Sequence, residues 1–271
     1  MIKKTAFSVL HGLVTEFQFC DFTPVDFELS INPDGQIPPY EVKLSDGGTV
    51  KIVGSVDRVD TYKTEENTFL RVVDYKTGGK DFVLGEVFYG LNMQMLIYLF
   101  AIWENGKEYY KDNIIPAGVL YFQAKNPKST STGISKDSEA DEVFKASLSE
   151  LKMDGMVLNN MQVFNAMDSK YDGAMLPAKY DEKTGSLKGK IISLKSFERL
   201  KNKVNDSIRE MAEDLHKGYI AALPVKDACI WCQYKDVCKR EEDDPINELE
   251  VLSFDDAISI LRSEEDGENL D

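Results

Sequence analysis

Residues 54–76 read GSVDRVDTYKTEENTFLRVVDYK, and this stretch decides the fold. β-Branched and aromatic residues are frequent on both sides of the polar run KTEENT, which predicts two strands joined by a hairpin. Folding the chain at the centre of that run places Asp57 opposite Asp74 and Asp60 opposite Arg71. This register gives one pair of opposite charge and several apolar pairs, which favours it over its neighbours.

The same register brings two carboxylates face to face. Directly opposite residues of a hairpin have Cβ atoms ~5 Å apart, and like charges so placed destabilise a sheet unless a cation neutralises them. Mg²⁺ typically takes one or two carboxylates together with phosphate and water oxygens. Lys76 follows Asp74 by two residues and therefore shares its face. An ammonium there can orient a metal-bound water or stabilise charge on phosphorus. The alternative is that Asp57 caps a turn and that Asp-Tyr-Lys is a chance tripeptide.

The remaining sequence predicts how these strands are enclosed. Helical periodicity covers residues 3–19 and 194–218, and a helix that is apolar nearly all round is expected over 86–105. Strands are expected at 27–31 and 118–122, and a hairpin at 40–52. Further helices are expected over 138–150 and 158–168, after a polar loop at 124–135. This order predicts a mixed α/β or α+β fold with one sheet.

Composition and charge exclude few partners. The chain has 271 residues, of which 42% are hydrophobic, and its longest apolar run is far short of the ~20 residues that span a bilayer. We therefore expect a cytoplasmic protein without a membrane span. The net charge is −15, but residues 241–271 hold 13 acidic residues and one basic residue. The acidic balance thus belongs to the C-terminal segment and does not exclude nucleic acid. A lysine-rich stretch at 183–203 is either a solvated helix face or a phosphate-binding surface.

Three motifs together resemble the RecB-like branch of the PD-(D/E)XK nucleases. They are GSVD at 54–57, VVDYKTG at 72–78 and QMLIY at 94–98. The resemblance implies a restriction-endonuclease-like core, in which a mixed central sheet is flanked by helices. It also implies that Asp57, Asp74 and the backbone carbonyl of Tyr75 bind Mg²⁺ or Mn²⁺, and that Lys76 assists the attacking water. Gln94 and Tyr98, four residues apart on one helix face, would form the DNA-side wall of the site. Without the resemblance, these two residues would be interpreted as hydrogen-bonded core groups.

The resemblance extends over roughly residues 10–242, which are similar to the C-terminal nuclease domain of AddB in the AddAB helicase–nucleases. It implies a nuclease domain at 1–242 and an acidic tail at 243–271 with a short helix. The implied activity is a metal-dependent exonuclease on single-stranded DNA ends, in double-strand break repair by recombination. A helicase partner subunit is expected, because the closest run to an ATP-binding loop, at 185–190, is one residue too short and lacks Ser or Thr after its Lys. The alternative is an inactive nuclease-fold scaffold that binds DNA or a partner.

Three cysteines near the end of the chain have the spacing of metal or cluster ligands. Cys229, Cys232 and Cys238 form C-x2-C-x5-C, in which thiolates can turn toward one centre. The resemblance implies that they are three of four ligands of a [4Fe–4S] cluster, with the fourth in an upstream segment that we expect this chain to lack. Cys20 is a weaker substitute for that ligand. Free thiols, or a zinc-dependent binding module, are the alternatives.

Histidine is the second departure from the resemblance. Many RecB-like nucleases carry a metal-binding histidine on a helix upstream of the site strands, whereas this sequence has only His11 and His216. His11 directly precedes the segment 22–28, where the family has a later helix, so we do not transfer the role to it. His216 is interpreted as a partner of a helix C-terminus. Glu28 is interpreted as an exposed strand residue.

Overall fold

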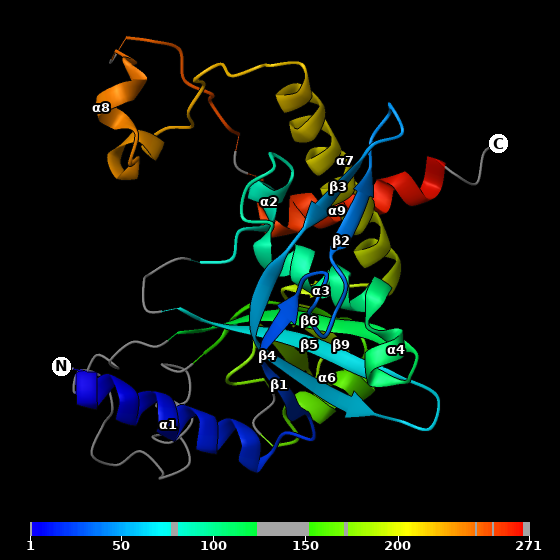
Figure 1. Ribbon diagram of the computed structural model, residues 1–271. Helices are drawn as coiled ribbons and strands as arrows, with labels where there is room; N and C mark the ends of the chain where they lie inside the picture. Colours follow the sequence, from blue (N-terminus) through cyan, green and yellow to red (C-terminus); the bar gives the residue numbers. More distant parts are fainter. Residues whose placement is uncertain are drawn as a thin grey trace.

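The computed structural model describes residues 2–76, 81–123, 152–170, 173–241, 243–250 and 252–267. Its centre is a six-stranded sheet with the order β1-β4-β5-β6-β7-β10 (Figure 1). The strands are β1 (Thr23–Ile31), β4 (Gly54–Lys63), β5 (Thr68–Lys76), β6 (Ile114–Gln123), β7 (Asp154–Leu158) and β10 (Ile191–Ile192). Two further pairs form small sheets, β2 (Tyr40–Lys43) with β3 (Thr49–Ile52) and β8 (Ala178–Asp181) with β9 (Ser186–Gly189).

The central sheet is mixed, as the sequence predicts. β4 is antiparallel to both β1 and β5, whereas β5 pairs in parallel with β6. The predicted hairpin register is confirmed, because Val59 pairs with Val72 and Asp60 with Arg71. The regular pairing of β4 with β5 ends at Arg58 and Val73. Asp57 and the last three residues of β5 therefore lie just beyond the ladder.

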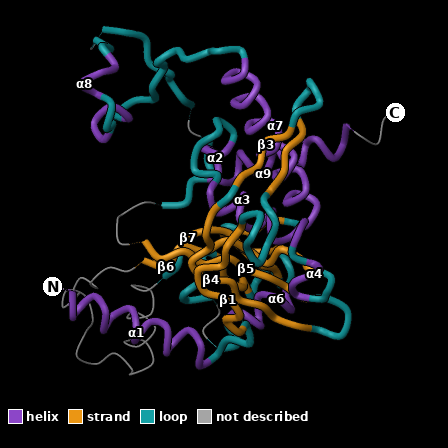
Figure 2. Tube along the Cα trace, in the orientation of Figure 1, coloured by secondary structure: helices purple, strands orange, loops and turns teal. Residues whose placement is uncertain are grey.

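Helices cover both faces of this sheet. Helix α1 (Ile2–Gln18) lies on one side, and α3 (Gln94–Asn105), α7 (Leu194–His216) and α9 (Phe254–Gly267) lie on the other (Figure 2). Shorter helices are α2 (Leu84–Val87), α4 (Lys107–Tyr110), α6 (Met161–Met167) and α8 (Lys235–Cys238), with the 3-10 turn η1 at Ala228–Trp231. The apolar core fills the space between β5, β6 and α3, where Val72, Leu99 and Phe100 are fully buried. Among the described residues, the structure has no helix long and apolar enough to cross a membrane.

Three expectations from the sequence were wrong or incomplete. The helix expected over 86–105 is interrupted between α2 and α3, because Gly90 (φ 74°) and Asn92 (φ 54°) adopt left-handed backbone conformations that end a helix. The expected single sheet is three sheets, since β2–β3 and β8–β9 pair separately. β7 and β10 were not predicted, because each is a short apolar run with little alternation. The loop at 124–135 and the helix at 138–150 fall outside the described residues.

The C-terminal acidic segment contains α9, which packs against α2 and α7. Ala257 and Leu261 are buried in the core, and Arg199 Nη1 donates a hydrogen bond to the Leu261 carbonyl at 2.7 Å. Between α7 and α9, the chain carrying α8 extends away from the sheet (Figure 1). Most of its described residues are exposed. The division of the chain at residue 242 stays a prediction.

Candidate metal centre

Asp57, Asp74 and Lys76 meet where the β4–β5 ladder ends. Asp57 Oδ2 accepts a hydrogen bond from the backbone N–H of Tyr75 at 3.1 Å, which ties β4 to β5 beyond their last ladder pair. Lys76 Nζ lies 2.8 Å from Asp74 Oδ2. Asp74 is only 7% exposed, whereas Asp57 and Lys76 are half-buried. The structure therefore brings together the acidic and basic residues that the sequence predicts.

The donor set at this place fits a hard divalent cation. Asp74 Oδ2 is a buried oxygen that receives no well-aligned hydrogen bond, and its close contact is with the Lys76 ammonium. A buried carboxylate with an unused lone pair is costly unless a cation lies next to it. Carboxylate oxygens suit Mg²⁺ and Mn²⁺, and Mg²⁺ needs only one or two of them from a protein. Among the described residues, no three His, Cys, Asp or Glu side chains converge on one point.

Lys76 rests against Tyr121 on the neighbouring strand β6. Its Nζ lies 5.1 Å from the centre of the Tyr121 ring, and the Tyr121 hydroxyl donates to Asn92 Oδ1 at 3.2 Å. Burial raises the pKa of Tyr121 to about 12, and the negative charges of Asp74, Asp154 and Glu86 act in the same direction. Tyr121 is therefore neutral at pH 7 and holds the lysine by ring contact.

The chain after β5 is held to the sheet by a second pair of charged residues, which the sequence analysis did not identify. Asp154 accepts a hydrogen bond from the Phe82 N–H, and Lys190 donates to the Phe82 carbonyl at 3.0 Å. Lys190 Nζ also lies 2.5 Å from Asp154 Oδ1. The lysine-rich stretch is thus divided, because Lys190 anchors this segment while Lys201 lies on α7 over the Trp103 ring.

Gln94 and Tyr98 lie together at the start of α3, and they also contact the first site motif. Gln94 Nε2 donates to the Tyr98 hydroxyl at 3.1 Å. The Tyr98 ring packs on Gly54, where a Cβ atom would lie 2.6 Å from Tyr98 Cε1. Gly54 is therefore required for this close approach of α3 to β4.

We predict that Gly54→Ala displaces the Tyr98 ring, because the added methyl group overlaps it. Overpacking of this kind costs about 1–3 kcal/mol of unfolding free energy, measurable by urea denaturation. The double variant with Tyr98→Ala removes the overlap and should recover part of the loss. Equal and additive effects of the two changes would show that no such contact exists.

Behind the site, on the α1 side of the sheet, four buried charged residues form one network. Glu16 Oε1 contacts Arg58 Nη2 at 2.9 Å and Arg71 Nη2 at 2.5 Å. Asp60 receives both guanidinium groups, with Oδ2 at 2.8 Å from each. Burial alone would lower the pKa of Arg58, but Glu16 and Asp60 raise it above its usual value. The sequence predicted the pairing of Asp60 with Arg71. It did not reveal Glu16 and Arg58 as their partners, although charges in a valine-rich strand were a signal.

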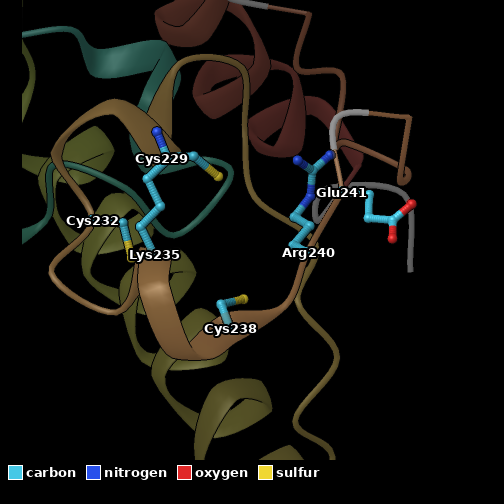
Figure 3. A pocket seen from close by; sticks show the side chains of 6 residues that line it. All are labelled: Cys229, Cys232, Lys235, Cys238, Arg240 and Glu241. Atoms are coloured by element: carbon cyan, nitrogen blue, oxygen red, sulfur yellow. The ribbon is translucent and has the colours of Figure 1, made fainter.

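The three late cysteines line one cavity of about 390 Å³, together with Lys235, Arg240 and Glu241 (Figure 3). Cys232 and Cys238 are exposed, and all three are free thiols. Three soft donors around one space are the right chemistry for an iron–sulfur cluster or zinc. The structure does not bring Cys20 to this cavity, because its Sγ lies 3.6 Å from Arg71 Nη2 beside the buried network.

The remaining candidates lie on the surface. His11 is exposed on α1, and His216 ends α7 with Nδ1 3.7 Å from Asp46 Oδ2. Glu28 has a positive φ of 51° and accepts a hydrogen bond from the Ser55 hydroxyl at 3.2 Å. Its neighbours Phe27 and Leu29 pair with Arg58 and Val56. Glu28 therefore lies opposite Asp57 across β1 and β4, closer to the site than the sequence suggested.

Comparison with known families decides what this arrangement belongs to. The model of the PD-(D/E)XK nuclease superfamily matches residues 3–239, which include the strands of the site, α1 and the three cysteines. The chain belongs to the PD-(D/E)XK nuclease superfamily. Nucleases of this superfamily generally use divalent metal ions, in agreement with the oxygen donors at the end of the β4–β5 ladder.

Curated relatives within the PD-(D/E)XK nucleases share one description, the B component of an ATP-dependent helicase/deoxyribonuclease. The protein of Acetivibrio thermocellus is 34% identical over 91% of this chain and 22% of its own length. That of Ruminiclostridium cellulolyticum is 33% identical over 89% of this chain and 21% of its own. That of a Thermoanaerobacter species is 35% identical over 81% and 19%. The chain thus spans about a fifth of the length of these relatives.

Proposed function

We propose that this protein is a Mg²⁺-dependent deoxyribonuclease that hydrolyses phosphodiester bonds from single-stranded DNA ends. The observation that carries the proposal is the meeting of Asp57, Asp74 and Lys76 at one strand end in a nuclease-superfamily chain. The names of the relatives, which are helicase/deoxyribonuclease subunits, support DNA as the substrate.

Asp57, Asp74 and the backbone carbonyl of Tyr75 would hold the metal ion. The N–H and C=O of a strand residue point toward the same neighbouring strand. Because the Tyr75 N–H points to Asp57, its carbonyl is directed toward β4 as well. A bound Mg²⁺ supplies polarisation of the phosphoryl oxygen and activation of water. The carboxylates bind and orient, and the partial burial of Asp74 excludes bulk water.

Lys76 would act on the nucleophile and on the charge that develops at phosphorus. Its ammonium is held between Asp74 and the Tyr121 ring, so it is placed in advance of the reaction. Gln94 and Tyr98 would position the DNA strand, because both lie at the site-facing end of α3 and contact Gly54 or one another.

We predict that Lys76→Met separates cleavage from metal binding. Loss of one charge-stabilising donor should lower the cleavage rate by about 10²–10³-fold. The Kd for Mg²⁺ should stay the same or fall, because the lysine no longer offsets the Asp74 charge. Single-turnover cleavage and a Mg²⁺ titration measure the two effects. Lys63→Met, at the far end of β4, is the matched control. A Lys76→Met variant that cleaves at the wild-type rate would exclude this role.

The end dependence is tested on linear and circular single-stranded DNA of the same sequence. An exonuclease degrades the linear form in Mg²⁺ and leaves the circle intact. Cutting of the circle would show an endonuclease. If neither form is cut and Mg²⁺ does not bind, the chain is a scaffold of nuclease fold.

We also propose that the chain works in double-strand break repair, together with a helicase partner subunit, and that Cys229, Cys232 and Cys238 hold a [4Fe–4S] cluster. The relatives' names support the first part, since they describe one subunit of a helicase/deoxyribonuclease. The shared cavity of the three thiols supports the second. Iron and sulfide analysis of protein purified without oxygen tests it, and a zinc-containing or metal-free sample would contradict it.

A further inference from the structure

The end of the β4–β5 ladder is held by Tyr75 from both sides of the sheet. Regular pairing stops at Arg58 and Val73, one residue before the site. Beyond that point, the Tyr75 N–H donates to Asp57 Oδ2 at 3.1 Å. Its hydroxyl accepts a hydrogen bond from Arg58 Nη1 at 2.9 Å. Two consecutive residues of β4 thus fix the residue between Asp74 and Lys76.

The Arg58 side chain is itself immobile. It is fully buried, and its Nε and Nη2 bond the two oxygens of Asp60, each at 2.8 Å. Nη2 also bonds Glu16 Oε1 on α1 at 2.9 Å. A guanidinium held in a fork by a carboxylate has a defined direction as well as a defined place. The Tyr75 hydroxyl is therefore bonded to a group that cannot follow it if β5 shifts.

The network has a cost that stability alone does not explain. It buries two carboxylates and two guanidinium groups, and both Glu16 Oε2 and Arg71 Nη1 lack hydrogen-bond partners. Apolar side chains of similar volume are frequently as stabilising as buried ion pairs or more so. What they cannot supply is a directed contact to the Tyr75 hydroxyl.

We propose that Arg58 and Tyr75 are positioning residues that fix the spacing of Asp57 and Asp74, and thereby make the metal centre select Mg²⁺ over larger cations. This inference rests on the proposed metal-dependent function of the same carboxylates. Mg²⁺ requires near-ideal geometry at about 2.0–2.1 Å, whereas Ca²⁺ accepts flexible geometry at about 2.3–2.6 Å. A rigid support behind the ligands favours the smaller ion, and a loosened support penalises it first.

Tyr75→Phe removes only the hydroxyl and tests the inference. The Kd for Mg²⁺ should rise about tenfold, the usual range for loss of a group that supports a metal ligand. The Kd for Ca²⁺ should change by less than about twofold, because its site adapts. Both are measured by titrating the backbone amide signals of residues 74–76 by NMR. Tyr62→Phe, the same change farther along β4, should alter neither Kd. Equal changes for both ions would overturn the selectivity.

Hydrogen exchange in metal-free protein gives a second readout that needs no cation. In the Tyr75→Phe variant, the amide of residue 75 should exchange at least about tenfold faster, because its bond to Asp57 opens more often. Arg58→Lys keeps the charge but loses the fork, and should show the same change wherever it folds. Unchanged exchange would overturn the positioning role. If wild-type protein does not bind Mg²⁺ but exchange responds as expected, the proposed function fails and the positioning role stands.

Discussion

Asp74→Ala should abolish Mg²⁺-dependent DNA cleavage while the protein stays folded. The carboxylate is the more buried of the two proposed metal ligands, and its removal leaves one carboxylate next to the Lys76 ammonium. A metal ion contributes several kcal/mol of transition-state stabilisation, so a rate loss of about 10³-fold or more is expected. Cleavage of labelled single-stranded DNA, together with the Mg²⁺-induced shifts of nearby amides, measures both consequences.

The matched control is Asp112→Ala at the other end of the same pair of strands. Asp112 accepts a hydrogen bond from Thr68 at the first residue of β5, and this bond lowers its pKa. The variant loses a hydrogen-bonded aspartate on the same strands but should keep its cleavage rate. Activity retained in Asp74→Ala, with Asp112→Ala also active, would mean that the metal centre lies elsewhere.

Arg71→Met should destabilise the protein more than any surface change. It leaves Glu16 and Asp60, two fully desolvated carboxylates, with a single guanidinium partner. Breaking a buried ion pair by removing one partner typically costs about 3–5 kcal/mol of unfolding free energy. Urea denaturation monitored by circular dichroism gives the difference directly.

Lys51→Met is the control for that prediction. Lys51 forms an ion pair with Glu41 at 2.9 Å in the β2–β3 hairpin, where both side chains are more than half exposed. Pairs of this kind contribute about 0–1 kcal/mol. A loss in Arg71→Met no greater than in Lys51→Met would show that the buried network contributes little to stability.

The strands of the site could be predicted because their information is local. The polar run between β4 and β5 sets the centre of the hairpin, and alternation then fixes which side chains share a face. Val59 therefore faces Val72 in the structure as in the sequence-based register. The meeting of Asp57, Asp74 and Lys76 at one place needed no further knowledge of the fold.

The contacts behind the site could not be predicted in this way, because they join residues far apart in the chain. Glu16 reaches Arg58 and Arg71 only when α1 packs under the sheet. The approach of Tyr98 to Gly54 likewise depends on how α3 crosses β4. The break between α2 and α3 was missed because Gly90 and Asn92 lie within an apolar pattern that otherwise favours a continuous helix.

The docking of α9 has a practical meaning for anyone who shortens this protein. Its charge suggests a dispensable solubilising extension, yet the backbone carbonyl of Leu252 packs so closely on Gly85 that no Cβ atom would fit there. Ala257, Ile258 and Leu261 form part of the same interior as α7. Trimming the polypeptide before this helix would uncover greasy surface on α2 and α7 and promote clumping of the product.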